Sequence, residues 1–280
     1  MEEVVRRRRF RVNFRGSLSL PFFVFMLFFV VVPLILIVYF SFTDDQGHIY
    51  LDNWRLIFTS PDKWKTILLT FEIAILTTVI CILIAYPIAF ILSNKKFNKN
   101  KILVYFFVLP MWVNFVVRTM ALRDMANDMF DSIFHFQLTA KYPVAGTVAG
   151  MVYDYLPFAI LPLYNQMLKM DKNQIEAAAD LGANPVVVFF KVILPMTVPG
   201  IIAAATMTFM PTMSSYVVAD QMGNGKVFII GSLIENYVNT IHDNNAASIL
   251  SLVMLFIIGL SLVAEKFFSK KDEDRKVGIW

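Results

Sequence analysis

The chain is organised as long apolar runs with few charged residues, separated by polar segments. Six runs are present, at residues 18–42, 67–92, 102–122, 144–168, 192–219 and 246–264. A helix must continue through about 20 apolar residues to cross a hydrocarbon core about 30 Å thick, and it must satisfy its own backbone because lipid offers no hydrogen-bond partners. The pattern therefore predicts an all-α polytopic membrane protein with six transmembrane helices.

Prolines interrupt the predicted helices. They fall within or at the ends of the runs, at Pro33, Pro87, Pro110, Pro157, Pro162, Pro195, Pro199 and Pro211. Each removes a backbone donor, and in a membrane the freed carbonyls are satisfied by neighbouring helices or by local backbone adjustments. We therefore expect several of the helices to bend.

Lys and Arg residues are distributed unevenly between the segments that flank the runs. The two chain ends and the second-to-third and fourth-to-fifth connections hold 18 of them, whereas the alternate connections hold 6. Because cytoplasmic loops carry the excess of Lys and Arg, this asymmetry predicts that both termini are cytoplasmic. The expected organisation is a basic N-terminal segment at 1–17, a six-span domain at 18–268 with a cytoplasmic loop at about 169–191, and a cytoplasmic tail at 269–280.

Composition agrees with a membrane location. Hydrophobic residues make up 58% and charged residues 16% of the chain, against about 45–50% and about 25% in soluble proteins. The first run is longer than the apolar region of a signal peptide, about 7–15 residues, and no small-residue cleavage site follows it, so we expect an uncleaved first span. The net charge of +4 is explained by basic residues that face anionic lipid, and nucleic acid is not an expected partner.

The residue types that carry chemistry in enzymes are few and scattered. Cys81 is the only cysteine, and the three histidines lie in separate segments, so neither a disulfide nor a zinc site is expected. The one Gly-Lys pair, Gly225-Lys226, does not make a phosphate loop, because Val227 stands where Ser or Thr should hold magnesium. We expect no catalysis and no cofactor or metal bound by this chain.

The connection between the fourth and fifth runs contains the most specific signals. It predicts two short helices with a break. Asn173 is a candidate cap for the first helix, with Glu176 able to return the bond, and Gly182 supplies a left-handed residue that ends it. Asn184 is a suitable cap for the second helix, and Pro185 suits its first position. By themselves these capping signals favour an ordinary cytoplasmic helical hairpin.

The same connection carries a spaced pattern, made of Glu176, Ala177, Ala178, Gly182, Leu194 and Pro195. It resembles the EAA signature of ABC importer permeases, with Val192 where that family usually has Ile. By this resemblance the chain is identified as a member of the family. The resemblance implies a type I importer permease fold in the bacterial inner membrane. It also implies a coupling helix that docks on a dimer of a separate cytoplasmic ATPase, which binds the ATP and magnesium.

The residues of this loop suit such a contact physically. Ala177, Ala178 and Ala179 form a small-residue surface that another backbone can approach closely, and Gly182 sets the angle between the two helices. Glu176 has two possible roles, capping its own helix or pairing with a cation on the ATPase. Both roles stay open at this point.

Further stretches resemble the spermidine/putrescine permeases of the PotB type. They are the Leu-Pro-Met-Trp-Val-Asn run at 109–114 with Arg118, the stretch at 150–164, and the Tyr-Val-Val-Ala-Asp-Gln-Met-Gly-Asn run at 216–224. That resemblance implies a second homologous permease, an extracytoplasmic polyamine-binding protein, and a substrate path between the two permeases.

A polyamine path should offer carboxylates at intervals and aromatic faces for cation–π contact. The candidates are Glu72, Trp112, Tyr153, Asp154, Tyr216 and Asp220. Alternatively, the acids within spans lie near headgroups or pair with a partner permease, and the aromatic residues are interface anchors. Arg118 is either an internal partner of these acids or faces an aqueous cavity.

Three other functions stay open from sequence. A permease for thiamine, iron, molybdate or another anion predicts the same loop but favours basic groups in the passage. A stand-alone secondary transporter leaves the EAA pattern without a purpose. A structural membrane anchor leaves unexplained the cost of charged residues in the membrane, about 2.5–3.5 kcal/mol each.

Overall fold

The structure is a computed structural model that describes residues 20–44, 46–94 and 102–277. These residues are almost entirely helical, and the β structure among them is an isolated bridge between Thr43 and Ile49. The predicted basic N-terminal segment and the basic residues between the second and third spans lie outside the described residues.

Most of the predicted spans are continuous helices. Within the described ranges, five segments are long and apolar enough to cross a membrane, and a bent pair of helices makes a sixth if it is counted as one span. The five are Pro21–Ser41, Pro61–Ser93, Pro143–Leu168, Pro185–Ser214 and Asn244–Val263. They match the first, second, fourth, fifth and sixth predicted runs, which confirms the all-α polytopic prediction.

The first two spans flank a short helix. α2 (Leu20–Met26), the π-helical segment η1 (Leu27–Val31) and α3 (Val32–Ser41) make the first span. After α4 (Asp52–Thr59), α5 (Pro61–Ser93) forms the second. It begins earlier than predicted because Pro61 is suited to the first helical turn, where its missing N–H has no partner to lose.

The third predicted span is broken. α6 (Ile102–Val108) and the 3-10 turn η2 (Leu109–Trp112) are followed, after a bend of 96°, by α7 (Phe115–Phe134). The break has a local cause. The side chain of Asn114 accepts hydrogen bonds from the backbone N–H groups of the next turn, so it starts a new helix in a new direction.

The second half of the chain contains the remaining long helices and their connections. α8 (Leu138–Lys141) leads into α9 (Pro143–Leu168), and α10 (Lys172–Asp180) follows. α11 (Pro185–Val188), η3 (Phe189–Ile193) and α12 (Leu194–Ser214) form the continuous fifth span. α13 (Tyr216–Met222), α14 (Ile230–Asn236) and η4 (Tyr237–Ile241) connect it to α15 (Asn244–Val277).

The fifth span ends at Ser214, before the predicted end at residue 219. Pro211 lies in its last turn and removes a backbone donor there. Tyr216 and Asp220 therefore belong to the separate helix α13, where they lie beyond the end of the span.

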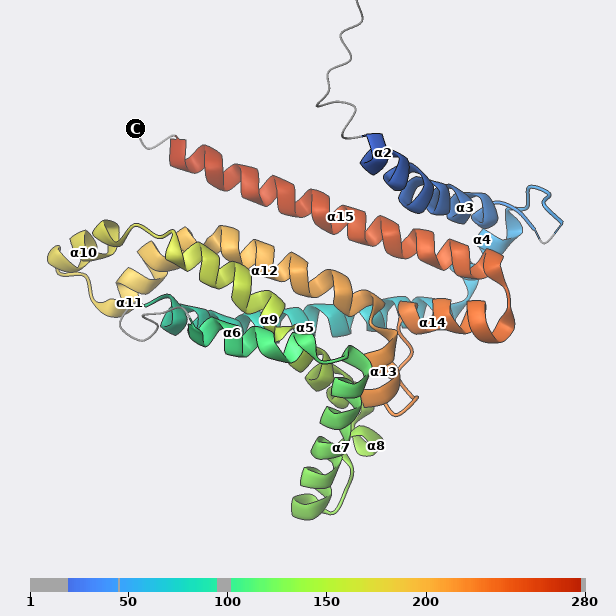
Figure 1. Cartoon of the computed structure of the whole chain (residues 1–280), viewed down its shortest axis with the longest axis horizontal. Helices are drawn as coiled ribbons and strands as arrows, with labels where there is room; N and C mark the ends of the chain where they lie inside the picture. The colour runs from blue at the N-terminus through green and yellow to red at the C-terminus, as the bar shows by residue number, and fades with distance from the viewer. Residues whose placement is uncertain (1–19, 45, 95–101, 278–280) are drawn as a thin grey trace, which may run out of the picture.

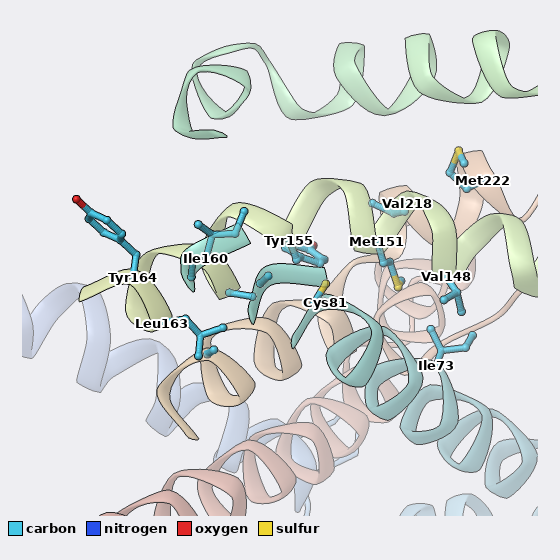
Figure 2. Packing of buried hydrophobic residues seen from close by; sticks show 14 of the residues in the cluster. Ile73, Cys81, Val148, Met151, Tyr155, Ile160, Leu163, Tyr164, Val218 and Met222 are labelled. Atoms are coloured by element: carbon cyan, nitrogen blue, oxygen red, sulfur yellow. The ribbon is translucent and has the colours of Figure 1, made fainter. Parts of the chain in front are cut away.

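α5, α9 and α12 pack together at the centre of the molecule. Ala85, Ala159 and Ala204 are fully buried between them and allow the backbones to approach closely, as small residues do in membrane helix interfaces. Larger side chains such as Cys81 and Met151 fill the remaining space, as Figure 2 shows.

The long helices run side by side and their connections gather at two ends (Figure 1). α10 and α11 lie at one end, together with the C-terminal end of α15, and we call this the α10 end. α4, α13 and α14 lie at the opposite end, which we call the α13 end. α7 and α8 project sideways from the α13 end, and α3 packs against α15 outside the central trio.

Candidate functional site

The first candidate region is the elbow, defined as residues 171–188 at the α10 end. Its first helix is capped by Asp171, whose carboxylate accepts a hydrogen bond from the backbone N–H of Asn173 at 3.0 Å. The expectation that Asn173 is the cap and Glu176 its capping-box partner is therefore corrected. Asp171 is favoured as the cap because an ionised carboxylate at the start of a helix also interacts favourably with the helix dipole. Glu176 is left exposed and has no cap to complete.

Gly182 ends α10 as the sequence predicts. Its φ is +81°, in the left-handed region that favours glycine. The N–H of Gly182 donates to the carbonyl of Ala179 at 2.9 Å, and the N–H of Ala183 donates to that of Ala178 at 3.1 Å. This paired arrangement is a Schellman motif, which satisfies the last carbonyls of α10 and fixes the turn of the chain.

The second helix of the elbow is joined rigidly to the fifth span. The side chain of Asn184 accepts from the N–H of Val187 at 2.8 Å, and Pro185 occupies the first helical turn, as predicted. From α11 the helix continues through η3 into α12 without a break. Phe189 packs edge-to-face on Tyr86 of α5 with ring centroids 5.7 Å apart, so the junction is also held from the side.

The outer face of the elbow and of the start of the fifth span is largely apolar. In the elbow Glu176 and Ala177 are exposed and Ala178 is half-buried, and in the fifth span Pro195 is exposed and Leu194 is half-buried. The described residues also leave large hydrophobic side chains uncovered in these two segments, namely Leu181 at 89%, Val186 at 63% and Phe190 at 60% exposure. Exposed apolar patches bordered by polar residues are typical of surfaces that bind another protein.

The second candidate region lies at the bend between η2 and α7. Asp154 of α9 is completely buried, and Arg118 of α7 pairs with it through Nε and Nη2, both at 2.8 Å from Oδ1. The other carboxylate oxygen accepts from the Thr119 hydroxyl at 2.9 Å. Arg118 also donates through Nη1 to the carbonyl of Pro110 at 2.8 Å. One guanidinium therefore ties together both sides of the helix break and α9.

A cavity of about 590 Å³ lies beside this ion pair. Trp112 and Asp154 both line it, and Trp112 is 84% exposed. The Arg118 guanidinium lies 5.7 Å from the ring centroid of Tyr153, within cation–π distance. Three of the six path candidates therefore gather here, but the charge of Asp154 is already matched by Arg118.

Two other path candidates line a separate cavity of about 520 Å³ at the α13 end. They are Tyr216 and Asp220, both on α13. Glu72 joins neither group, because it lies exposed on α5 outside both cavities. The six candidates thus divide into two cavity groups and one isolated carboxylate.

Sequence reasoning missed several residues of these sites. Glu235 lines the second cavity, and Thr119 completes the hydrogen bonding of Asp154. Each is an ordinary polar residue with no motif around it. The available signal for Glu235 was that it is an acidic residue between the fifth and sixth runs, close in sequence to the candidate pair of α13.

Most of the chain is similar to known proteins. Residues 82–270 match the family described as "Binding-protein-dependent transport system inner membrane component". The spermidine/putrescine transport system permease protein PotB of Haemophilus influenzae is 33% identical over 271 residues, which cover 90% of this chain and 94% of that protein. The protein of the same name from Escherichia coli K12 is 28% identical and covers 89% of this chain and 96% of its own length.

The fold itself also has a solved counterpart. A chain of a bacterial ABC transporter involved in import of the acidic polysaccharide alginate superposes with a TM-score of 0.75 at 15% identity, covering 92% of this chain and 95% of that chain. At 15% identity this similarity shows a shared fold and nothing about function. Together with the family match over most of the chain, these findings show that the protein belongs to the family of binding-protein-dependent transport system inner membrane components and has the fold of an ABC importer permease.

Proposed function

We propose that this chain is a permease subunit of an ABC importer that moves polyamines such as spermidine and putrescine into the cell. The observation that carries the choice of cargo is the match along 90% of the chain to a protein named as a spermidine/putrescine permease. In the proposed assembly, a second homologous permease, a dimer of cytoplasmic ATPases and an extracytoplasmic polyamine-binding protein complete the importer. ATP and magnesium bind to the ATPase and not to this chain.

In this proposal the elbow is the contact with the ATPase. The exposed Ala177 and the half-buried Ala178 let the partner approach closely, Gly182 holds the bend, and Glu176 is free to pair with a cation of the partner. Leu194 and Pro195 begin α12, so a displacement of the elbow is passed along one continuous helix to Ser214 at the α13 end.

The proposed path for the cargo uses the candidates at the α13 end. Tyr216 and Asp220 line a cavity there, and Trp112 and Tyr153 offer aromatic faces beside the bend of the third span. Asp154 contributes by holding Arg118 in place. Glu72 is exposed on α5 and is proposed to face the second permease.

We further propose that the α10 end faces the cytoplasm, with both chain termini, and that the organisation into segments 1–17, 18–268 and 269–280 holds. Cys81 is the only cysteine and is fully buried, so single cysteines can be introduced without a reactive background. A membrane-impermeant maleimide applied to intact cells should label Lys226→Cys at the α13 end. Lys169→Cys, exposed at the α10 end just before the elbow, should be labelled only after permeabilisation. Labelling in the opposite order would reverse the proposed orientation.

The decisive test of function is uptake by the complete reconstituted importer. Proteoliposomes containing both permeases and the ATPase should accumulate radiolabelled spermidine only with ATP inside the compartment that holds the ATPase and with loaded binding protein on the other side. A catalytically inactive ATPase is the matched control. Accumulation with that inactive ATPase would overturn the importer proposal in favour of a secondary transporter, and ATP-driven uptake of a different solute would overturn only the cargo.

A further inference from the structure

The cavity at the α13 end differs in its chemistry from the cavity beside Arg118 and Asp154. It measures about 520 Å³ and lies where α13, α14 and the start of α7 meet. Its lining brings together Asp220 and Glu235 with the aromatic rings of Tyr216 and Phe228. Glu235 comes from α14, so two different helices each contribute a carboxylate.

Neither carboxylate is neutralised within the part of the chain that the structure describes. No Lys, Arg or His nitrogen there lies within 4.0 Å of Asp220 or Glu235, although four such pairs occur elsewhere. Asp220 accepts a hydrogen bond from the Gln221 amide at 3.1 Å, and Glu235 accepts one from Asn239 at 3.3 Å. These neutral donors orient the acids and leave their charges uncompensated.

Arg123 of α7 contacts a lining residue of the cavity, but its charge is matched by another acid. Arg123 pairs with Asp124 at 2.8 Å, and through Nη1 it donates to the Gln221 side-chain oxygen at 2.7 Å. That bond fixes the Gln221 amide with its NH₂ group toward Asp220. Arg123 therefore positions the lining residue while its own charge is taken by Asp124.

The rest of the lining suits the hydrocarbon part of an amine. Tyr216 is 43% and Phe228 is 50% exposed, so both ring surfaces are open to a bound molecule. Methylene groups that pack on such rings remove apolar surface from water, which is favourable. Ser232 also lines the cavity, and its Oγ is buried with no hydrogen-bond partner among the described residues.

We propose that this cavity is a binding site for an organic cation with at least two amino groups, with one ammonium on Asp220, another on Glu235, and the methylene chain between them on Tyr216 and Phe228. This inference rests on the proposed function and deepens it, because it assigns the polyamine a specific site on this subunit. The cavity beside Arg118 and Asp154 is not an equivalent site, since its carboxylate is already paired with a cation inside the protein.

The test uses the complete importer in nanodiscs, without the binding protein, and measures equilibrium binding of radiolabelled spermidine. Asp220→Asn combined with Glu235→Gln keeps the shape of both side chains and removes both charges. Because hydrogen bonds to charged groups are roughly twice as strong as neutral ones, affinity should fall at least about tenfold. Asp128→Asn combined with Asp131→Asn is the matched control, since it removes two exposed acids of α7 outside the cavity and should leave affinity unchanged.

Two results would overturn the site. One is unchanged spermidine binding by the double variant at Asp220 and Glu235, in a complex that elutes as folded protein. The other is an equal loss in the control variant, which would mean that the site reflects only the general negative field of this end. Failure of the polyamine proposal looks different, because the unaltered importer would then neither bind nor import spermidine.

Discussion

The elbow and the bend of the third span are both turns between helices, but they are held in opposite ways. In the elbow each fixing hydrogen bond joins residues a few positions apart, such as Asp171 with Asn173 and Asn184 with Val187. The surface around these bonds is exposed. At the bend of the third span, Arg118 reaches across 36 positions to a carboxylate with no exposure to solvent.

The difference indicates which region is built to contact a partner and which to stay fixed. A bend held by local caps can sit on the surface, because its strength does not depend on neighbouring helices. A bend held by a buried ion pair depends on the whole bundle, because the pair is stable only where both charges are matched and hydrogen-bonded. Four substitutions, each with a comparison or control, test this difference between the two bends.

The largest effect is expected from Arg118→Ala. It leaves Asp154 buried without a cation and frees the Pro110 carbonyl, and breaking a buried pair on one side typically costs about 3–5 kcal/mol. We expect a lower apparent melting temperature in detergent and a reduced yield of folded protein. Arg118→Lys should be intermediate, because a single ammonium does not reach both Asp154 and Pro110 with the fork geometry of guanidinium.

A double-mutant cycle checks the cause of that loss. Removing both charges with Arg118→Met and Asp154→Leu should cost less than the sum of the single changes, because no unpaired charge then remains buried. Strict additivity of the two single variants would show that the pair does not hold the bend.

Gly182→Val should affect function strongly and stability moderately. A Cβ at Gly182 meets no atom within 4 Å, so the cost comes from the positive φ alone and amounts to about 1–3 kcal/mol for a non-glycine residue. We expect the protein to reach the membrane while cargo-dependent ATPase stimulation and spermidine uptake are lost. Gly182→Asn should keep more activity, because Asn tolerates the left-handed region better.

The matched control for this substitution is Gly47→Val. Gly47 has nearly the same φ, +80°, but lies in the connection after the first span. A Cβ there would lie 3.3 Å from the Tyr39 hydroxyl, so the strain of Gly47→Val should be at least as large as that of Gly182→Val. Gly47→Val should preserve uptake. If Gly47→Val and Gly182→Val abolish uptake equally, the loss reflects strain in general and the elbow has no special role.

Asp171→Ala tests the local caps. Replacing a capping Asp by Ala costs about 1 kcal/mol of helix stability, and here it frees the N–H of Asn173. The expected result is faster hydrogen exchange in α10 with little change in α5 or α9. Asn173→Ala is the comparison, and a larger effect of Asn173→Ala would restore Asn173 as the cap.

Glu176→Gln should have the smallest effect on stability. The start of α10 is already capped by Asp171, so the charge of Glu176 is not needed for the helix. A decrease in cargo-stimulated ATP hydrolysis at unchanged melting temperature is the expected result. A drop in melting temperature with unchanged coupling would assign Glu176 to the helix instead.

The sequence predictions for the candidate sites succeeded mainly where the structure depends on neighbouring residues. Gly182, Asn184 and Pro185 were predicted correctly because turn chemistry depends on neighbouring residues. The Asn173 cap was wrong because the helix begins earlier, with Asp171 as its cap, so that Asn173 lies inside the first turn. Bending of proline-containing spans was expected, with Pro110 in the third, but the sharp break at Asn114 was missed because this residue lies inside an apolar run, where its capping signal is hidden.

The sequence by itself determined the helical membrane fold, the number of apolar runs and the turn of the elbow, because lipid forces long apolar helices and because caps act over a few residues. Only the tertiary structure decided that Asp154 is matched by Arg118, whereas Asp220 shares a cavity with Glu235 and has no cation within ion-pair distance among the described residues. The physical reason is that the energy of a carboxylate depends on which charges and donors surround it in space, and those groups come from helices far apart in the chain.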